Sequence, residues 1–205
     1  TDLQSIGRLV DRWDAIGRGK PVWMGLQGFS WHKVKAGRKR LYPSYHQSRF
    51  MAYDAIAHGA RGIFYWGTQT IDDPLFRESL YALTAELGEL EPLLVGADQT
   101  VEVAVIDDLF DAPGIGVRGT LKSNQADYLL ILVNEDDHRH LGVDVTELEA
   151  LNGRTLHLLY GDEKIVVRKE GIVTRMQAHE VKLFCTNPRF ETKRTMGRDY
   201  VDAGK

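Results

Sequence analysis

The sequence predicts a mixed α/β fold in which a parallel strand–helix–strand unit comes first and a β-rich segment follows. Two short apolar runs, residues 22–27 and 62–66, each end in a polar or aromatic residue, and a helical pattern separates them. Strands buried on both faces are typical of parallel sheets, whose strands are usually connected through a helix. After about residue 97, helical periods give way to short β-rich runs separated by turn residues. We therefore expect a domain boundary near residue 97.

The first part of the chain carries three helical patterns around the two strands. In the opening helix, the apolar residues recur at three- and four-residue steps, at Leu3, Ile6, Val10, Trp13 and Ile16. A second helix begins at Ser44, which forms a capping-box pattern with Gln47, and ends at Gly59. A third helix runs from about Asp73 to Leu90, and we expect Pro92 to close it.

The β-rich part predicts a small antiparallel sandwich over residues 98–187. Its expected strands are residues 101–106, 128–133, 141–145, 155–160, 165–168 and 180–185. Its single cysteine, Cys185, lies in the last of these strands, and we expect it to be a buried, inert thiol. Residues 188–205 are charged, lack periodicity and predict a loose tail.

Composition excludes several classes of partner. The formal net charge of −3 and the isoelectric point near 6.2 give no general attraction for nucleic acid, and no apolar run approaches the roughly 20 residues that cross a membrane. We therefore expect a soluble protein with no nucleic-acid or membrane partner. The chain starts at Thr1 without a targeting signal, so it looks like a processed piece or a fragment, and its compartment stays unknown.

Two segments resemble the last part of the catalytic (β/α)8 barrel of bacterial glycoside hydrolases. They read KPVWMGLQGFSW, residues 20–31, and RFMAYDAIAHGARGIFYWG, residues 49–67. The later stretches NEDDHRHLGVDV and LNGRTLHLLYGDE resemble the accessory β domain of such enzymes. The resemblance implies that residues 1–97 are the C-terminal portion of a TIM barrel, with strands 7 and 8 and their flanking helices. An N-terminal barrel portion or a partner chain would complete it.

The resemblance also implies a function. The chain would be the C-terminal fragment of a glycoside hydrolase, inactive alone, whose carboxylates come mostly from the missing barrel strands. Glycoside cleavage needs two carboxyl groups, about 5 Å apart for retention or about 6.5–9.5 Å apart for inversion. The family places its nucleophile at strand 7, where this chain has Gln27, and an amide is neither nucleophile nor base. Three explanations stay open: the strand register is shifted, the nucleophile lies upstream, or the protein does not hydrolyse sugars by this route.

Four residues are candidates for substrate binding, and none is assigned as catalytic. Gln27, Trp31, Trp66 and Gln69 follow the expected strand ends, where barrel enzymes build their sites. We expect Trp66 to stack on a sugar ring and Gln27 to donate a hydrogen bond to a sugar hydroxyl. Alternatively, Gln27 only satisfies loop backbone groups and the tryptophans belong to the core.

The remaining polar features are less specific. The basic run at residues 32–40 suits either an anionic sugar, such as a uronate or sulfated sugar, or a solvated loop. Asp72 and Asp73 follow the second strand and either face the cleft or, as we expect, Asp73 before Pro74 is the N-cap of the third helix. The seven histidines lack metal-ligand spacing, so we expect neither a metal nor a cofactor. The alternatives to the hydrolase are a non-catalytic carbohydrate-binding or scaffold protein on the same fold, and a self-sufficient α/β protein of unrelated function.

Overall fold

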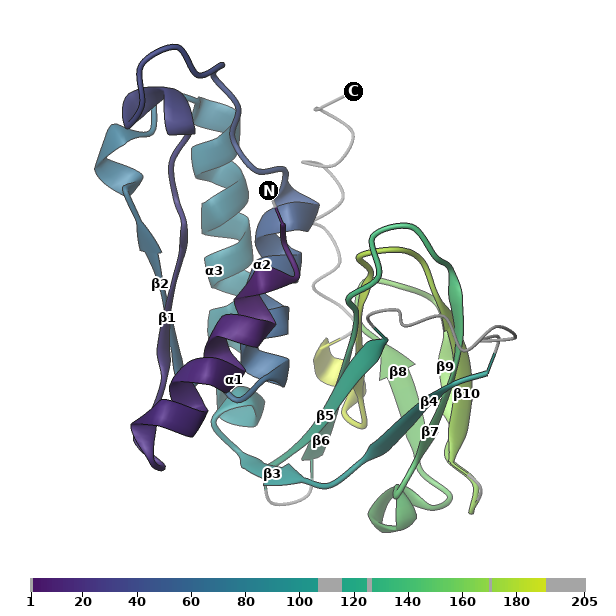
Figure 1. Cartoon of the computed structure of the whole chain (residues 1–205). Helices are drawn as coiled ribbons and strands as arrows, with labels where there is room; N and C mark the ends of the chain where they lie inside the picture. Colours follow the sequence, from purple (N-terminus) through teal and green to yellow (C-terminus); the bar gives the residue numbers. More distant parts are fainter. Residues whose placement is uncertain (1, 107–115, 125–126, 170, 191–205) are drawn as a thin grey trace. The chain divides into compact units, whose positions relative to one another are not determined.

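The computed structural model describes residues 2–106, 116–124, 127–169 and 171–190. Most of the predicted tail, residues 191–205, lies outside these residues. The described chain divides into two compact units, one ending at Glu89 and the other beginning at Leu90 (Figure 1). Each unit has its own sheets, and the mixture of helices with antiparallel sheets agrees with the predicted α/β class.

The first unit contains the predicted strand–helix–strand arrangement. Strands β1 (Trp23–Gln27) and β2 (Gly62–Trp66) pair in parallel, from Trp23 opposite Gly62 to Gln27 opposite Trp66. Helix α2 (Tyr45–Ala57) connects them. Helix α1 (Ser5–Gly17) precedes β1, and α3 (Pro74–Leu94) follows β2. Both apolar runs thus form neighbouring parallel strands, as the sequence predicts.

Helix α2 begins with the predicted capping box. The Ser44 hydroxyl accepts a hydrogen bond from the Gln47 amide nitrogen at 3.2 Å, and the Gln47 side-chain oxygen accepts one from the Ser44 nitrogen at 2.9 Å. Two backbone donors at the start of the helix are thereby satisfied. The helix is buried from Phe50 to Ala57, so it is a core element and not an amphipathic surface helix.

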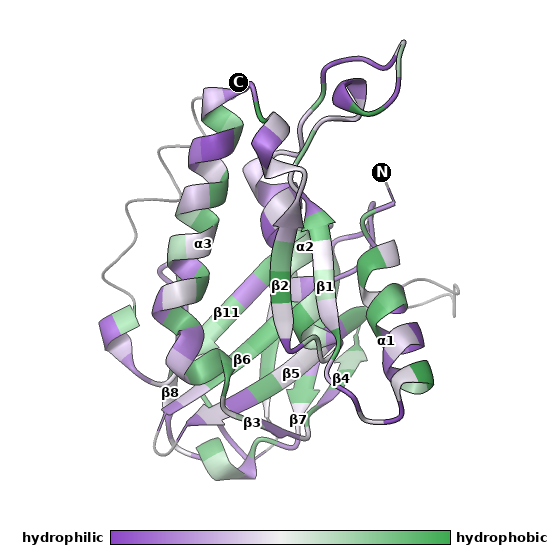
Figure 2. Cartoon of the chain, turned by 90° about the vertical axis from the view of Figure 1, so that its left-hand side faces the viewer, coloured by the Kyte–Doolittle hydropathy of each residue, from purple (hydrophilic) through white to green (hydrophobic). Residues whose placement is uncertain are grey.

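The two faces of the β1–β2 sheet differ. Met24 and Leu26 are buried on the face that carries the helices. On the opposite face, which Figure 2 turns toward the viewer, the side chains of Trp23, Phe64 and Trp66 are 66%, 48% and 55% exposed. Within the described residues, β1 and β2 pair only with each other. The sheet therefore has an exposed aromatic face and two open edges.

Helix α3 differs from the prediction at its C-terminal end. It continues through Pro92 to Leu94, so the expected stop at Pro92 is wrong. Pro92 lacks the N–H that would bond to the carbonyl four residues earlier, so the helix loses one hydrogen bond just before it ends. At the other end, the Asp73 carboxylate accepts a hydrogen bond from the Phe76 nitrogen at 3.1 Å, which confirms the predicted cap. None of the described helices is long and apolar enough to cross a membrane.

The second unit consists of two antiparallel sheets. Its strands are β3 (Ala97–Gln99), β4 (Glu102–Val105), β5 (Val117–Asn124), β6 (Asp127–Asn134), β7 (Leu141–Thr146), β8 (Thr155–Leu158), β9 (Lys164–Val166), β10 (Ile172–Met176) and β11 (Val181–Cys185). One sheet has the order β3-β5-β6-β11-β8-β9, and the other has the order β10-β7-β4. A single apolar core joins both sheets, with Leu132 and Phe184 from the first and Val143 and Ile172 from the second.

Three strands of this unit, β3, β5 and β10, are absent from the sequence prediction. Strand β5 lies inside a sheet but contains Gly119, Lys122 and Ser123. Glycine and lysine are uncommon in strands, so the sequence does not indicate a strand here. Lys122 is 2% exposed, and its ammonium group pairs with the Asp98 carboxylate of β3. Burying the lysine stem while its charge is paired makes a polar-looking segment compatible with the core. Cys185 is buried, as predicted, and this burial raises the pKa of its thiol to about 11.

Candidate functional site

The carboxyl ends of β1 and β2 bring two predicted site residues together. Gln27 lies opposite Trp66 in the strand register, and the Gly28 nitrogen donates a hydrogen bond to the Trp66 oxygen at 2.9 Å. The pairing therefore extends one residue beyond β1 before the chain turns away. Because the strands are parallel, the loops that follow them leave from the same edge of the sheet.

An aromatic cluster of Phe29, Trp31 and Trp66 covers this edge. The Phe29 ring centroid lies 5.0 Å from that of Trp31 and 5.0 Å from that of Trp66, with interplanar angles of 72° and 86°. Phe29 is buried, whereas the two indoles are 49% and 55% exposed. Edge-to-face contacts of this kind fix ring positions. The cluster therefore presents two oriented and half-exposed indoles.

Gly67 lets the chain pass close to the aromatic cluster. Its φ of +83° lies in the left-handed region, and a Cβ atom there would come within 2.9 Å of the Phe29 Cβ. A side chain at this position would therefore be strained in its backbone and would displace Phe29. Gly67, the last residue of the GIFYWG segment, thus allows Trp66 to lie beside Phe29.

The Gln27 side chain is held by the loop that it begins. Its Nε2 donates a hydrogen bond to the Phe29 carbonyl oxygen at 2.8 Å. This contact is the loop-satisfying role that the sequence left open as an alternative to sugar binding. The amide oxygen, which accepts up to two hydrogen bonds, has no partner among the described residues.

Two hollows adjoin this edge. The first, of about 400 Å³ and called here the strand-end hollow, is lined by Gln27, Trp31 and Trp66, together with Phe29 and Phe64. The second, of about 580 Å³ and called the loop hollow, lies under residues 37–43 and shares Gln27 and Trp31 with the first. Three of the four predicted binding residues thus line one hollow.

Gln69 does not join the other three predicted residues. It lies exposed in a short 3₁₀ helix, η2 (Thr68–Thr70), and lines neither hollow. Conversely, sequence reasoning missed Phe29 and Phe64. Phe64 was detectable, because the period of two along a strand places it on the same face as Trp66.

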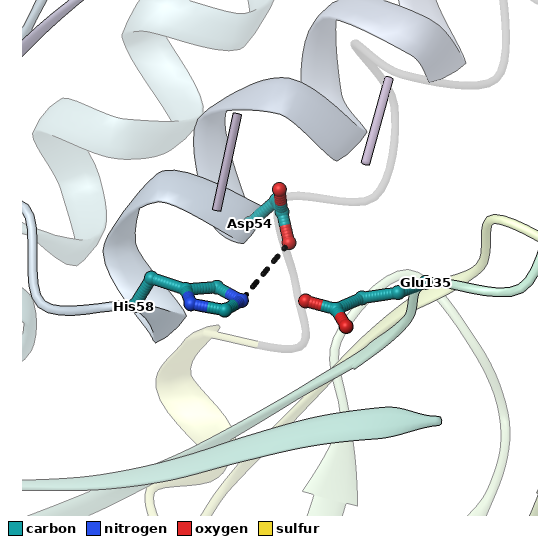
Figure 3. Close-up of side chains that lie close together, drawn as sticks. All are labelled: Asp54, His58 and Glu135. Atoms are coloured by element: carbon teal, nitrogen blue, oxygen red, sulfur yellow. Dashed lines mark ion pairs between the residues drawn. The ribbon is translucent and has the colours of Figure 1, made fainter. Parts of the chain in front are cut away.

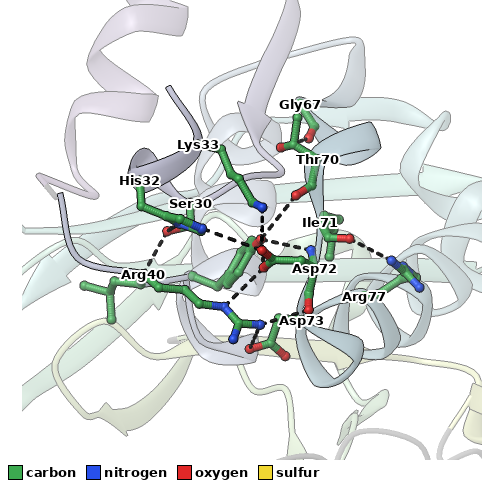
Figure 4. A network of polar contacts seen from close by, with 12 residues as sticks. Ser30, His32, Lys33, Arg40, Gly67, Thr70, Ile71, Asp72, Asp73 and Arg77 are labelled. Atoms are coloured by element: carbon green, nitrogen blue, oxygen red, sulfur yellow. Dashed lines mark hydrogen bonds and ion pairs between the residues drawn. The ribbon is translucent and has the colours of Figure 1, made fainter. Parts of the chain in front are cut away.

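The basic loop between β1 and α2 is attached at both ends by Ser30. This buried hydroxyl accepts a hydrogen bond from the Leu41 nitrogen at 2.8 Å and lies 2.8 Å from the His32 Nδ1 (Figure 4). The Ser30 Oγ atom therefore contacts both the beginning and the end of the loop. The loop starts with a short 3₁₀ helix, η1 (Trp31–Lys33), which positions Trp31.

Asp72 fastens the same loop by charge. Its carboxylate lies 2.5 Å from Lys33 Nζ and 3.1 Å from Arg40 Nε, and it accepts a hydrogen bond from the Tyr42 hydroxyl at 2.9 Å (Figure 4). The hydrogen bonds from Lys33 and Tyr42 and the charge of Arg40 hold the pKa of Asp72 well below its usual range. A carboxyl group with so low a pKa stays ionised at neutral pH and is not a general acid. Asp72 thus fastens the loop, whereas the neighbouring Asp73 caps α3 as predicted.

We expect Asp72→Asn to loosen this loop. The amide keeps an acceptor for Tyr42 but removes the charge that attracts Lys33 and Arg40. Limited trypsin digestion followed by mass spectrometry should show cleavage after Lys35 roughly five- to tenfold faster than in the native chain.

Asp73→Asn is the matched control for the loop. Asparagine retains the helix-capping oxygen, and the carboxylate that it replaces lies 3.7 Å from the nearest Arg40 nitrogen. It should leave the cleavage rate within about twofold of native. Equal cleavage rates in both variants would contradict the role assigned to Asp72. Because the folded pKa of Asp72 is lowered, its attachment is complete at neutral pH and weakens as the pH falls below about 4.

A second polar group, at the other end of the unit, is structural. The buried Asp54 carboxylate of α2 accepts a hydrogen bond from the Gly7 nitrogen at 2.7 Å and lies 3.7 Å from the His58 Nε2 (Figure 3). The other ring nitrogen of His58 lies 2.9 Å from an Asp11 carboxylate oxygen. These contacts connect α1 with α2 and hold the two helices in register.

No family model and no curated protein matches the chain. Similar solved structures include an α-amylase from Geobacillus thermoleovorans complexed with acarbose, with 14% identity, a TM-score of 0.48, and coverage of 69% of this chain and 33% of that chain. They also include an Anoxybacillus α-amylase, with 17% identity, a TM-score of 0.43, and coverage of 68% and 32%. A γ-CGTase from alkalophilic Bacillus clarkii has 15% identity, a TM-score of 0.42, and coverage of 74% and 24%.

The chain therefore spans about a third or less of the length of these carbohydrate-active proteins. TM-scores below 0.5 at such low identity do not establish a common fold.

Proposed function

We propose that this chain is the C-terminal, substrate-binding part of a glycoside hydrolase. In this proposal β1 and β2 are strands 7 and 8 of a (β/α)8 barrel, residues 98–187 are its accessory β domain, and the remaining barrel strands supply the cleaving carboxylates. The observation that carries the proposal is the aromatic cluster, whose two half-exposed indoles border the strand-end hollow at the carboxyl ends of parallel strands.

The chemistry of this edge suits a sugar. Pyranose rings have apolar C–H faces, which pack against aromatic rings, and hydroxyl groups at their rims, which need polar partners. Trp66 and Trp31 offer the aromatic faces. Because Gln27 Nε2 already donates to Phe29, we assign its amide oxygen as acceptor of a hydrogen bond from a sugar hydroxyl. This assignment replaces the donor role expected from the sequence.

The exposed sheet supports the idea of a barrel part. A two-stranded sheet is marginal alone, and its open edges and exposed aromatic face are the features that additional strands cover. In a closed barrel, the face with Trp23, Phe64 and Trp66 would point inward. Catalytic carboxylates are assigned to the added strands, because Gln27 is an amide and the Asp72 carboxylate is already paired with Lys33 and Arg40.

Gln27 also favours the second candidate function, a carbohydrate-binding protein without catalysis. An amide at the strand-7 end keeps hydrogen bonding but forms no glycosyl intermediate. The two candidates share the binding site and differ only in the barrel strands that complete it. Acidic residues at the ends of strands 4 and 6 would indicate the enzyme, and their absence would indicate the binding protein.

We expect Trp66→Ala to weaken oligosaccharide binding. Calorimetric titration of the chain with maltohexaose, cellohexaose and xylohexaose should identify a bound neutral sugar, and the variant should lose roughly 1–3 kcal/mol of its binding free energy. Trp23→Ala is the control, because Trp23 lies on the same sheet face but at the opposite strand end, and it should bind normally. Equal losses of binding free energy in the two variants would contradict the assignment of the sugar-binding site. Absence of binding to every sugar would also contradict it.

A further inference from the structure

We propose that the loop hollow binds a negatively charged sugar unit, bearing a carboxylate or a sulfate, that is covalently linked to the unit on the aromatic cluster. The inference rests on the proposed function and names its substrate class. The loop hollow shares Gln27 and Trp31 with the strand-end hollow, so one oligosaccharide can occupy both. Arg38 and Lys39 line only the loop hollow.

The charge around the loop hollow is unbalanced. Its lining contains Arg38 and Lys39 but no aspartate or glutamate, in a chain whose formal net charge is −3. Asp72 pairs with Lys33 and Arg40 of the same loop. Among the described residues, neither Arg38 nor Lys39 has an anionic partner, so the hollow holds two cations that a ligand can neutralise.

These two cations are presented by a loop that is fastened on both sides. Ser30 and Asp72 hold its ends, and Gly37, with a φ of +79°, makes the turn before Arg38. Fastened ends reduce the entropy that the loop loses when a ligand binds. The loop is thus a partly preorganised arm of the hollow, and its residues 33–41 are exposed to solvent.

The side chains match an acidic sugar. The planar guanidinium of Arg38 can donate two parallel hydrogen bonds to a carboxylate or a sulfate, and Lys39 adds a point charge. Gln27 and Gln47 at the hollow offer amide groups for hydroxyls of the same ring. Trp31, shared by both hollows, offers an indole between the charged and the neutral unit.

Binding of matched oligosaccharides to the chain tests the inference. The probes are a hexagalacturonate, its methyl ester, which removes the charge at nearly equal size, and a sulfated hexasaccharide with its desulfated form. At low salt, at least one charged probe should bind about tenfold or more tightly than its neutral form, and added salt should reduce the difference. The probe that shows the preference distinguishes carboxylate from sulfate.

The double variant Arg38→Gln/Lys39→Gln should lose this preference and retain the affinity for the neutral forms. Lys35→Gln is the matched control, because Lys35 belongs to the same loop and carries the same charge but does not line the hollow. It should change affinity less than about twofold. Equal binding of charged and neutral probes, with Trp66 still required, would overturn this inference alone. An equal loss of the preference for charged probes in Lys35→Gln would also overturn the inference. Absence of binding to every probe would overturn the proposed function as well.

Discussion

Glu86→Ala is expected to lower the free energy of unfolding by about 3–5 kcal/mol. The Glu86 carboxyl group of α3 is buried and accepts hydrogen bonds from Tyr45 at 2.8 Å, Arg49 at 2.9 Å and Tyr53 at 2.7 Å. Removing it leaves the Arg49 guanidinium buried without this partner. Although burial alone would lower the pKa of Arg49, Glu86 raises it, so the arginine keeps its charge. An unneutralised buried charge is among the costliest defects in a core.

Urea denaturation followed by circular dichroism measures this loss. Glu78→Ala is the control, because Glu78 lies exposed on the same helix and should change stability by about 0.5 kcal/mol or less. Glu86→Gln keeps hydrogen-bonding atoms but not the charge. Its loss of unfolding free energy should therefore lie between those of Glu86→Ala and Glu78→Ala. A loss in Glu86→Ala no larger than in Glu78→Ala would contradict the structural role assigned to this cluster.

The outer edge of β1 is expected to exchange its amide hydrogens rapidly. Hydrogen bonds alternate along a parallel strand, and the Gly28 nitrogen points inward to the Trp66 oxygen. The Leu26 amide therefore also points inward, whereas those of Gly25 and Gln27 point to the open edge. In the isolated chain, the outward amides should exchange on the order of 10³-fold faster than that of Leu26.

Hydrogen–deuterium exchange read by NMR measures these rates residue by residue. Adding a polypeptide that supplies the preceding barrel strands should then slow the outward amides, because β-pairing gives them acceptors. Slow exchange of Gly25 and Gln27 in the isolated chain would mean that the chain covers its own edge. That result would contradict the assignment of β1 and β2 to an incomplete barrel.

Local patterns were sufficient to predict the strand–helix–strand unit. The apolar runs ending at Gln27 and Trp66 predicted two parallel strands, and the register places these two residues opposite each other. The Ser44 capping box and the Asp73 cap are contacts between residues three apart, so the sequence displays them directly. Such features depend on few residues, which makes them accessible without a structure.

Contacts between distant segments were not accessible. Glu86 appears in the sequence as one acidic residue of an amphipathic helix, and its partners lie 33–41 residues earlier. Asp72 meets the basic loop about 30 residues earlier in the chain, a contact that no local pattern displays. No local pattern indicates the burial of Lys122, because its partner, Asp98, belongs to another strand. The candidate site was predictable to the extent that strand ends position it, whereas the arrangement of its loops was not.

The indole N–H resonances of the four tryptophans test the central claim most directly. Titration of the chain with the tightest-binding neutral hexasaccharide should shift the signals of Trp31 and Trp66 in a saturable manner. The signals of Trp23, at the opposite strand end, and Trp13, on α1, should not move. This result would place the sugar on the aromatic cluster at the carboxyl ends of β1 and β2. Saturable shifts of Trp13 or Trp23 in the absence of shifts of Trp31 and Trp66 would contradict the account.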